Sequence, residues 1–299
     1  MKTLTVFTPA YNRKETLRRT YKSLCMQNCK DFVWLIIDDG STDGTEGAVK
    51  AWMAENIIEI RYIYQENQGM HGAHNTAYHN IDTELNTCID SDDYMTDDAV
   101  EKIITTWKRY GSNKYAGLMG LDVRQDGSLI GTLFKDNLAP LSLTDFYRTG
   151  GKGDRKLVYR TDVINSYPDY PVFKGEKYVG LDYKYSLIDR DLPLLTLNEP
   201  LVVVEYQPDG SSNSMYRQYW NNPQGWCFYR KHKMKMAQTF SKRFREAIHY
   251  VSSSIRAKDA AFVFKSPYPL TTLAAIPAGI ILFLYTFYKV TRRRRMNIS

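Results

Sequence analysis

Residues 85–93 read Leu85-Asn86-Thr87-Cys88-Ile89-Asp90-Ser91-Asp92-Asp93, a short apolar run that ends in three carboxylates. The run is typical of a buried strand in a parallel sheet, and the acids follow at its carboxyl end, where open α/β sheets bind ligands. Three carboxylates within four residues repel one another unless a cation or hydrogen-bond donors compensate them. A hard divalent cation that also binds a diphosphate would do so. The alternative is a solvated acidic turn before the next helix.

Composition restricts the class of protein. The chain has 299 residues, 43% of them apolar, which suffices for one large α/β domain with appendages. Its formal charge of +7 is partly local, because Arg292–Arg295 form a basic run, and no basic stripe with interleaved aromatic residues indicates a nucleic-acid partner. The four cysteines form no CxxC pair or disulfide framework, and no N-terminal apolar segment resembles a secretory signal. We therefore expect reduced thiols in a cytosolic domain.

Strand and helix patterns alternate four times in the first part of the chain. We expect strands at residues 4–8, 32–37, 57–64 and 87–89, each followed by a helix, the last at about 97–110. This order predicts a mainly parallel sheet with right-handed crossovers. Neither GxGxxG nor GxxxxGK[ST] occurs, which disfavours a plain dinucleotide oxidoreductase and a P-loop kinase.

A second strand end is also acidic. The apolar run 32–37 leads directly into Asp38 and Asp39, and Thr42 or Asp43 can cap the helix that follows. A site for phosphate alone would favour backbone amides and basic side chains. Acids instead suit a hydrogen bond to a base or ribose at one strand end and a metal at the other.

Three motifs together resemble a known family. FTPAYNR at 7–13, LIIDDGSTDGT at 35–45 and IDSDD at 89–93 stand in the order and at the spacing of family 2 glycosyltransferases with the GT-A fold, which residues 1–210 resemble. EKYVGLDYKYSLID and EYQPDGSSNSM further resemble bacterial members that build capsule, exopolysaccharide or other surface glycans. The resemblance implies a Rossmann-like α/β fold, whose mixed, mainly parallel sheet is flanked by helices. It also implies an inverting enzyme that uses a UDP-sugar and Mn²⁺ or Mg²⁺.

The resemblance implies roles for residues at the strand ends. Thr8 and Tyr11 would contact the nucleotide, with the Tyr11 ring near the uracil, and Asp39 would accept a hydrogen bond from the uracil N–H. Asp92 would bind the metal, with Asp90 directed toward the ribose or a metal-bound water. The nucleotide contacts implied are Thr8, Pro9, Tyr11, Asn12, Asp39, Asn67, Gly69, Asp90 and Ser91.

Several candidates have an open alternative. Asp38 is equally well explained as a turn acid. His71 could touch the diphosphate, although a lone histidine is more often a structural donor. Ser211 and Ser212 lie in a polar loop that could fold over the diphosphate, with Arg217 adding charge, or could be a plain surface loop.

Asp182 is the expected catalytic base. The family commonly has an acid pair at this point, and this chain has Leu181 in one of the two positions, so only Asp182 keeps the match. A hydroxyl acceptor needs a group that takes its proton as the new bond forms. The alternative for Asp182 is an ordinary acid at a helix N-terminus, and Glu176 is the nearest rival base.

The later elements are predicted from pattern alone. Residues 117–123 and 129–134 predict a hairpin, and residues 156–159 and 201–206 predict two further strands. Residues 240–255 place their apolar side chains on one helical face and predict an amphipathic helix.

The C-terminal segment suggests a membrane anchor. Leu270–Tyr288 is the most apolar stretch, close to the length of a membrane span, and Arg292–Arg295 follow it. With a cytosolic catalytic domain, one span would place these arginines outside, against the positive-inside tendency. Pro277 divides the stretch into arms of roughly 7 and 9 residues, each too short to cross. We therefore expect a re-entrant or in-plane monotopic anchor on the cytoplasmic face of the cell membrane, with a single span as the alternative.

These observations predict a domain order and a reaction. We expect a catalytic domain at 1–215, divided into a nucleotide-sugar part at 1–110 and an acceptor part at 111–215, then a helical region at 216–265 and an anchor at 266–299. The expected reaction moves a sugar from a UDP-sugar to a hydroxyl of a membrane-associated, lipid-linked glycan in surface polysaccharide synthesis. A sugar nucleotidyltransferase and a non-catalytic nucleotide-binding scaffold at the membrane are the alternatives.

Overall fold

The computed structural model of this chain describes residues 2–205 and 215–296, with side chains up to Arg292. The chain forms two compact units, which are described one at a time. The first comprises Met1–Asp169 and Lys184–Gln207, and the second comprises Tyr170–Tyr183 and Pro208–Ser299. Tyr170–Tyr183 thus groups with the C-terminal helices, although the sequence on either side of it belongs to the first unit.

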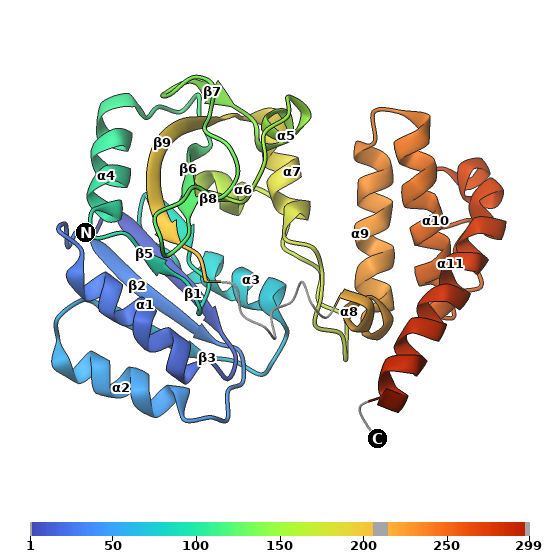
Figure 1. The fold of residues 1–299 in the computed structure, drawn as a ribbon, viewed down its shortest axis with the longest axis horizontal. Helices are drawn as coiled ribbons and strands as arrows, with labels where there is room; N and C mark the ends of the chain where they lie inside the picture. Colours follow the sequence, from blue (N-terminus) through green and yellow to red (C-terminus); the bar gives the residue numbers. More distant parts are fainter. Residues whose placement is uncertain (1, 206–214, 297–299) are drawn as a thin grey trace. The chain divides into compact units, whose positions relative to one another are not determined.

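The first unit begins with the predicted strand–helix repeats (Figure 1). Four strands pair in parallel in the order β3-β2-β1-β4, which confirms the predicted parallel sheet. The elements are β1 (Leu4–Ala10), α1 (Lys14–Met26), β2 (Phe32–Asp38), α2 (Thr45–Glu55), β3 (Ile60–Tyr64), α3 (Met70–Asn80) and β4 (Leu85–Cys88).

The rest of the unit extends this into a mixed sheet. Strand β8 runs antiparallel between β4 and β6, and β6 pairs in parallel with β9. The full order is β3-β2-β1-β4-β8-β6-β9-β5, with β7 paired to β9. The elements are β5 (Tyr94–Met95), α4 (Ala99–Tyr110), β6 (Gly117–Val123), β7 (Pro140–Leu141), α5 (Leu143–Arg148), β8 (Arg155–Arg160), α6 (Thr161–Ser166), α7 (Asp182–Asp191) and β9 (Leu194–Val203). The first two residues of α7 group with the second unit.

The predicted hairpin is wrong in its second strand. The turn forms, because Arg124 N–H donates to the Ser128 carbonyl over 2.8 Å, but Val123 and Leu129 make only an isolated bridge. Strand β6 already pairs with β8 on one side and β9 on the other, so residues 129–134 find no free edge there.

The cap predicted for α2 also differs. Gly44 occupies the N-cap position with φ 87°, a left-handed conformation that glycine adopts readily, and no side chain caps it. Asp43 still contributes nearby, because its Oδ1 accepts hydrogen bonds from the Thr45 N–H (3.1 Å) and hydroxyl (2.6 Å).

Strands β1 and β2 are buried on both faces, so adjacent residues face different layers. In β1, Val6 belongs to the core that α1, α2 and α4 cover. Phe7 points the other way and meets the Tyr78 ring of α3 edge-on, with the ring centroids 5.4 Å apart. Helices therefore cover both faces, and the carboxyl ends of the parallel strands form one edge.

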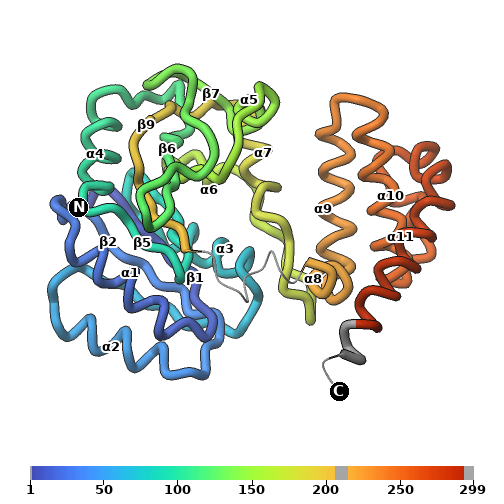
Figure 2. Tube along the Cα trace, in the orientation of Figure 1, coloured from blue at the N-terminus to red at the C-terminus, as the bar shows by residue number. Residues whose placement is uncertain are grey.

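The second unit contains four helices among its described residues, namely α8 (Met215–Asn221), α9 (Pro223–Met236), α10 (Phe240–Arg256) and α11 (Pro269–Met296). Figure 2 shows α9, α10 and α11 lying side by side, and they share a core in which Met234, Tyr250 and Ala275 are buried. Helix α10 confirms the predicted amphipathic helix, and its N-cap Thr239 accepts a hydrogen bond from Lys242 N–H.

Helix α11 runs without interruption through Pro277. The predicted division into two arms at this proline is therefore wrong. Ala275 before the proline lies in the core shared with α10, and Gly279 after it lies against Val251 of α10, so packing on both sides keeps the helix intact despite the missing hydrogen bond. Residues Pro269–Arg292 contain an 18-residue window with mean hydropathy 1.9, so this helix is long and apolar enough to cross a membrane.

Candidate functional site

The end of β1 carries one buried and one exposed candidate. Thr8 is fully buried, and its hydroxyl accepts a 3.0 Å hydrogen bond from the Trp34 indole N–H on β2. Pro9 also lies within the buried strand. Tyr11, just beyond the strand, is 51% exposed. Its ring is thus accessible for stacking, whereas the Thr8 side chain is committed to the core.

Asn12 connects two strand-end loops. It adopts the left-handed region with φ 52°, and its N–H donates to Ser41 Oγ over 2.9 Å. Its Oδ1 accepts from Thr42 N–H over 2.8 Å. Asn12 therefore fixes the loop after β1 against the loop after β2.

Asp39 organises the loop that precedes α3. It is buried, and its Oδ1 accepts hydrogen bonds from Gln65 Nε2 (2.7 Å) and Gln68 N–H (2.8 Å). Its Oδ2 accepts from Gly69 N–H over 2.8 Å. Asp39 thus holds the loop that carries Asn67 and Gly69, two other predicted nucleotide contacts.

Asp38 has partners of its own. Its two oxygens accept from Ser41 N–H and the Tyr62 hydroxyl, each over 2.7 Å. Burial raises the pKa of Tyr62, and the hydrogen bond to Asp38 raises it further. These contacts agree with the turn-acid interpretation of Asp38.

The acids after β4 occupy different depths. Asp90 is exposed, Asp92 is half-buried, and Ser91 and Asp93 are buried. Burial raises the pKa of Asp92, and the nearby charge of Asp90 raises it further. Burial raises the pKa of Asp93 to about 7. The Asp93 carboxylate accepts from Glu205 N–H over 3.0 Å, which ties the acidic loop to the residues after β9.

The structure adds two charged residues that the sequence reading missed. Lys156 on β8 donates to the Cys88 carbonyl over 3.0 Å. Burial acts to lower its pKa, but Asp122, Asp90 and other nearby groups raise it overall. Asp122 on β6 is buried, and burial raises its pKa to about 6. A charged residue inside an otherwise buried strand was the available signal, but only strand pairing shows which acids it meets.

The donor set fits a metal that is shared with a substrate. Among the described residues, no three His, Cys, Asp or Glu side chains converge into a ready metal site. Mg²⁺ and Mn²⁺ commonly take one or two carboxylates from the protein and the rest of their ligands from substrate phosphates and water. Burial and the Asp90 charge disfavour ionised Asp92, and a cation would relieve both effects.

Two of the three histidines of α3, His71 and His74, are buried. His71, in the first turn, is buried. Burial lowers the pKa of His74 to about 3, so its imidazole is neutral at physiological pH. Its Nδ1 lies 3.1 Å from the Tyr78 hydroxyl. His74 therefore supplies no fixed positive charge.

Asp182 belongs to the second unit. Its Oδ2 accepts hydrogen bonds from the Tyr229 hydroxyl (2.8 Å) and from Lys233 Nζ (3.0 Å), both on α9. Burial raises the pKa of Tyr229, and the Asp182 charge raises it further. Both donors lie on one helix, so the orientation of the carboxylate is fixed from one side. No sequence spacing links residues 182, 229 and 233, so folding alone brings them together.

Glu176 has a different environment. It is buried, and its two oxygens accept from Gln224 N–H (2.9 Å) and Gly225 N–H (2.8 Å). These amides lie in the first turn of α9, whose dipole favours a negative charge. Glu176 therefore caps the N-terminal amides of α9. Because both of its oxygens are engaged in this way, the case for Glu176 as the alternative base is weaker.

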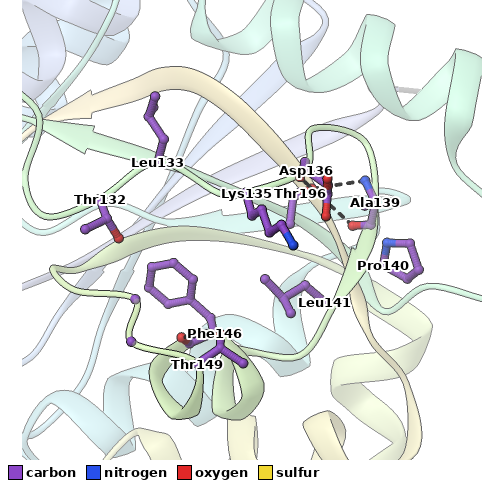
Figure 3. A pocket seen from close by; sticks show the side chains of 12 residues that line it. Thr132, Leu133, Lys135, Asp136, Ala139, Pro140, Leu141, Phe146, Thr149 and Thr196 are labelled. Atoms are coloured by element: carbon purple, nitrogen blue, oxygen red, sulfur yellow. Dashed lines mark hydrogen bonds between the residues drawn. The ribbon is translucent and has the colours of Figure 1, made fainter.

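The remaining candidate site residues are Ser211, Ser212 and Arg217. Ser211 and Ser212 lie outside the described residues. Arg217 is exposed on α8. A cavity of about 550 Å³ opens elsewhere in the first unit, beside β7, and Figure 3 shows Lys135, Phe146 and Thr196 among its lining side chains. None of the predicted site residues lines it.

Comparison with known proteins identifies relatives of part of the chain. The description "Glycosyl transferase family 2" matches residues 5–121. Glycosyltransferase GlyA of Streptococcus pneumoniae is 36% identical over 100 residues, 33% of this chain and 14% of that protein. The GalNAc(5)-diNAcBac-PP-undecaprenol beta-1,3-glucosyltransferase of Campylobacter jejuni is 29% identical over 172 residues, 56% of this chain and 54% of that protein. The chain thus spans about half the length of these relatives or less.

Solved structures share the fold. S. aureus TarS 1–349 is similar with a TM-score of 0.61 and 16% identity, covering 98% of this chain and 92% of that one. Its complex with UDP-GlcNAc also matches with a TM-score of 0.61, at 16% identity over 94% of this chain and 81% of that one. The mannosyltransferase PcManGT from Pyrobaculum calidifontis, in complex with GDP-Man and Mn²⁺, matches with a TM-score of 0.55 and 15% identity, covering 94% and 87%. At these identities the likeness shows the GT-A-like α/β fold.

Proposed function

The chain belongs to glycosyl transferase family 2 through residues 5–121, and from this premise we propose that it transfers one sugar from a UDP-sugar to a hydroxyl group of a membrane-associated, lipid-linked glycan. Inversion at the anomeric carbon follows if the acceptor hydroxyl displaces UDP in line. The reaction would serve the synthesis of a surface polysaccharide.

The acidic strand ends on either side of β1 carry this proposal. β2 ends at Asp38 and β4 leads to Asp90–Asp93, and both strands run parallel to β1, so their carboxyl ends meet at one edge. Asp39 and Tyr11 on one side suit a base, and Asp90 and Asp92 on the other suit a ribose and a diphosphate. The UDP-GlcNAc complex of the TarS structure supports a UDP-sugar as the donor.

A divalent cation fits this arrangement as a cofactor. Asp92 would hold Mn²⁺ or Mg²⁺ jointly with the donor diphosphate, with Asp90 beside it. The cation would supply Lewis-acid stabilisation of the negative charge on the departing UDP. The Mn²⁺ in the PcManGT structure supports this choice of metal.

Asp182 is the proposed base. Tyr229 and Lys233 hold its Oδ2 by two hydrogen bonds, so Oδ1 is the oxygen proposed to receive the acceptor proton. Tyr229 and Lys233 would thus be positioning residues that fix the orientation of the base.

The acceptor proposal rests on chemistry at the membrane. The Campylobacter relative is named for a polyprenyl-diphosphate-linked glycan, and the apolar helix α11 gives this chain a means to reach such a lipid. UDP-sugars are made in the cytosol, so we propose the cytoplasmic face of the cell membrane as the location.

Acceptor-dependent release of UDP tests the proposal. The purified full chain is first screened for thermal stabilisation by individual UDP-sugars with and without Mn²⁺, and the best donor is then incubated with lipid-linked glycans. We expect UDP release only when an acceptor is present. Pyrophosphate release from UTP and a sugar 1-phosphate would instead indicate a nucleotidyltransferase. Nucleotide binding without either product would indicate a scaffold.

A further inference from the structure

Helix α11 packs with small side chains and exposes its large ones. Thr272, Ala275, Gly279 and Thr286 are buried against the rest of the helical unit. We call the opposite face the outward stripe, and it comprises Leu270, Leu273, Ile280, Ile281, Leu284 and Tyr288. A helix in water normally turns its large apolar side chains inward. This helix does the reverse.

The buried face of α11 is already complete. A Cβ at Gly279 would lie 2.4 Å from Val251 Cγ1 and 3.1 Å from the Ile248 carbonyl oxygen, so α10 and α11 are in close contact there. On α8, the Trp220 ring stacks on Phe283 with centroids 5.7 Å apart. The outward stripe is therefore an additional surface and not an unfilled part of this core.

Exposure of the stripe is extensive. Leu270 is 84% exposed, Ile281 69% and Leu284 57%. Contiguous apolar surfaces of this kind on soluble proteins mark binding sites for proteins or membranes. The stripe thus requires an occupant.

The distribution of charged residues along α11 indicates what covers the outward stripe. No Asp, Glu, Lys or Arg occurs between Lys265 and Lys289, and the run Arg292–Arg295 then follows. Lys289 Nζ lies 5.5 Å from the centroid of the Tyr285 ring, which is itself exposed. Tyrosine beside basic residues at the end of an apolar segment is typical of the interface between lipid headgroups and acyl chains.

We propose that α11 lies in the plane of an anionic lipid bilayer, with the outward stripe among the acyl chains and its basic end, which begins at Lys289 and Arg292, on the headgroups. The geometry deepens the proposed function, because it places the chain beside a lipid-linked acceptor. Its test does not depend on sugar transfer. A second copy of the chain is the other occupant that the test below distinguishes.

Packing argues against a span. The contact of Gly279 with Ile248 lies near the middle of Pro269–Arg292, and Arg245 and Glu246 are within one helical turn of Ile248. A spanning α11 would carry these two charges close to the bilayer centre, where charged side chains are strongly disfavoured. The uninterrupted helix likewise argues against a re-entrant hairpin.

Flotation with lipid vesicles tests the surface. The full chain is mixed with vesicles of phosphatidylcholine, with or without phosphatidylglycerol. We expect flotation with the anionic vesicles and weaker binding at high salt. The variant Ile281→Glu with Leu284→Glu should lose roughly tenfold or more in partitioning, because both changes remove apolar side chains from the lipid. The control Met53→Glu with Ile57→Glu, at exposed apolar positions of the other unit, should float like the wild type.

Depth measurements distinguish the orientations. A fluorophore is attached at Leu273→Cys, Ile281→Cys or Tyr288→Cys, with the four native cysteines replaced by serine and flotation rechecked. An in-plane helix places all three at the same shallow depth. A span would place position 281 about 10–12 Å deeper than either end, at 1.5 Å per residue.

Two results would overturn the inference. One is unequal depth along the stripe. The other is failure of the wild-type chain to float, and in that case a dimer dissociated by Ile281→Glu with Leu284→Glu would assign the stripe to a second copy. A chain that floats but releases no UDP would overturn the proposed function alone.

Discussion

Individual residues show how carboxylates with similar sequence contexts acquire different roles. Asp39 and Glu176 are both buried and both accept backbone N–H groups, so each organises the segment around it. Asp92 is half-buried and lies beside the charge of Asp90. Asp182 is paired with Lys233. The environment of each carboxylate, more than its place in a motif, indicates what it can do.

The metal proposal predicts the effect of Asp92→Asn. The amide keeps the size of the side chain but loses the charge that a divalent cation needs, so we expect Mn²⁺-dependent stabilisation by a UDP-sugar to disappear while the melting temperature of the free protein changes little. Thermal shift with and without Mn²⁺ measures this. The control is Asp97→Asn, at an exposed acid of the same segment. Retained Mn²⁺ dependence in Asp92→Asn would contradict the assignment.

The base proposal predicts different effects for two acids. Asp182→Asn cannot take a proton, so we expect acceptor-dependent turnover to fall by about 10²–10⁴-fold with donor affinity near that of the wild type. Glu176→Gln weakens the start of α9, so we expect a lower melting temperature with activity kept in the folded fraction. Steady-state kinetics and thermal unfolding separate the two. Normal turnover in Asp182→Asn with a folded but inactive Glu176→Gln would move the base to Glu176.

Burial of Asp122 predicts a pH-dependent stability. Its folded pKa of about 6 lies above the unfolded value of 3.8, so the folded state holds the proton more tightly and this contribution is lost as pH rises from about 4 to 7. Asp122→Asn mimics the protonated form. The unfolding free energy of the variant should therefore rise relative to that of the wild type as pH rises, by about 2–3 kcal/mol across this range. Denaturant unfolding at a series of pH values measures this difference. A difference that does not vary with pH would refute the shift.

At the scale of elements, close contacts decide which helices pack. α10 and α11 meet at Gly279, where only a hydrogen fits, whereas α2 leaves Gly47 with no neighbour within 4 Å. Both glycines are helical, and sequence pattern treats them alike. Only Gly279 is needed for packing, because α10 leaves no space for a side chain there.

The contact at Gly279 predicts a matched pair of substitutions. Gly279→Leu would force α10 and α11 apart, and we expect a loss of about 1–3 kcal/mol in unfolding free energy. Gly47→Ala meets nothing and removes a helix-disfavouring glycine, so it should gain up to about 1 kcal/mol. Chemical denaturation compares them. Equal stabilities for Gly279→Leu and the wild type would mean that the two helices do not touch as described.

At the scale of the whole molecule, the chain folds as two units joined in an order that sequence does not suggest. Tyr170–Tyr183 leaves the first unit and binds the C-terminal helices, where Lys177 N–H donates to Asn222 Oδ1 over 2.6 Å. The segments predicted as a helical region and as an anchor share one core through α10 and α11. Helix α11, the predicted anchor, is therefore a structural part of its unit.

Truncation at Lys265 tests this organisation. Removing residues 266–299 uncovers Ala247 and Val251 of α10, so we expect faster amide exchange in α9 and α10, with β1–β4 as protected as before. UDP should still stabilise the shortened chain, because the proposed nucleotide contacts lie in the first unit. Removing only residues 297–299 is the control. Unchanged protection of α10 in the longer truncation would show that α11 is a dispensable anchor.

The sequence by itself determined the parallel half of the sheet, the acidic strand ends and the family resemblance. These depend on local signals, because hydrophobic runs fix strands, and the carboxyl ends of parallel strands share one edge. Only the tertiary structure decided that β6 has no free edge for a hairpin, that the charge of Asp122 acts on Lys156, and that α9 supplies the partners of Asp182. Those contacts join residues far apart in the chain, and packing, which no local pattern encodes, selects them. The same holds for α11, whose apolar composition is local but whose outward face is set by what α10 covers.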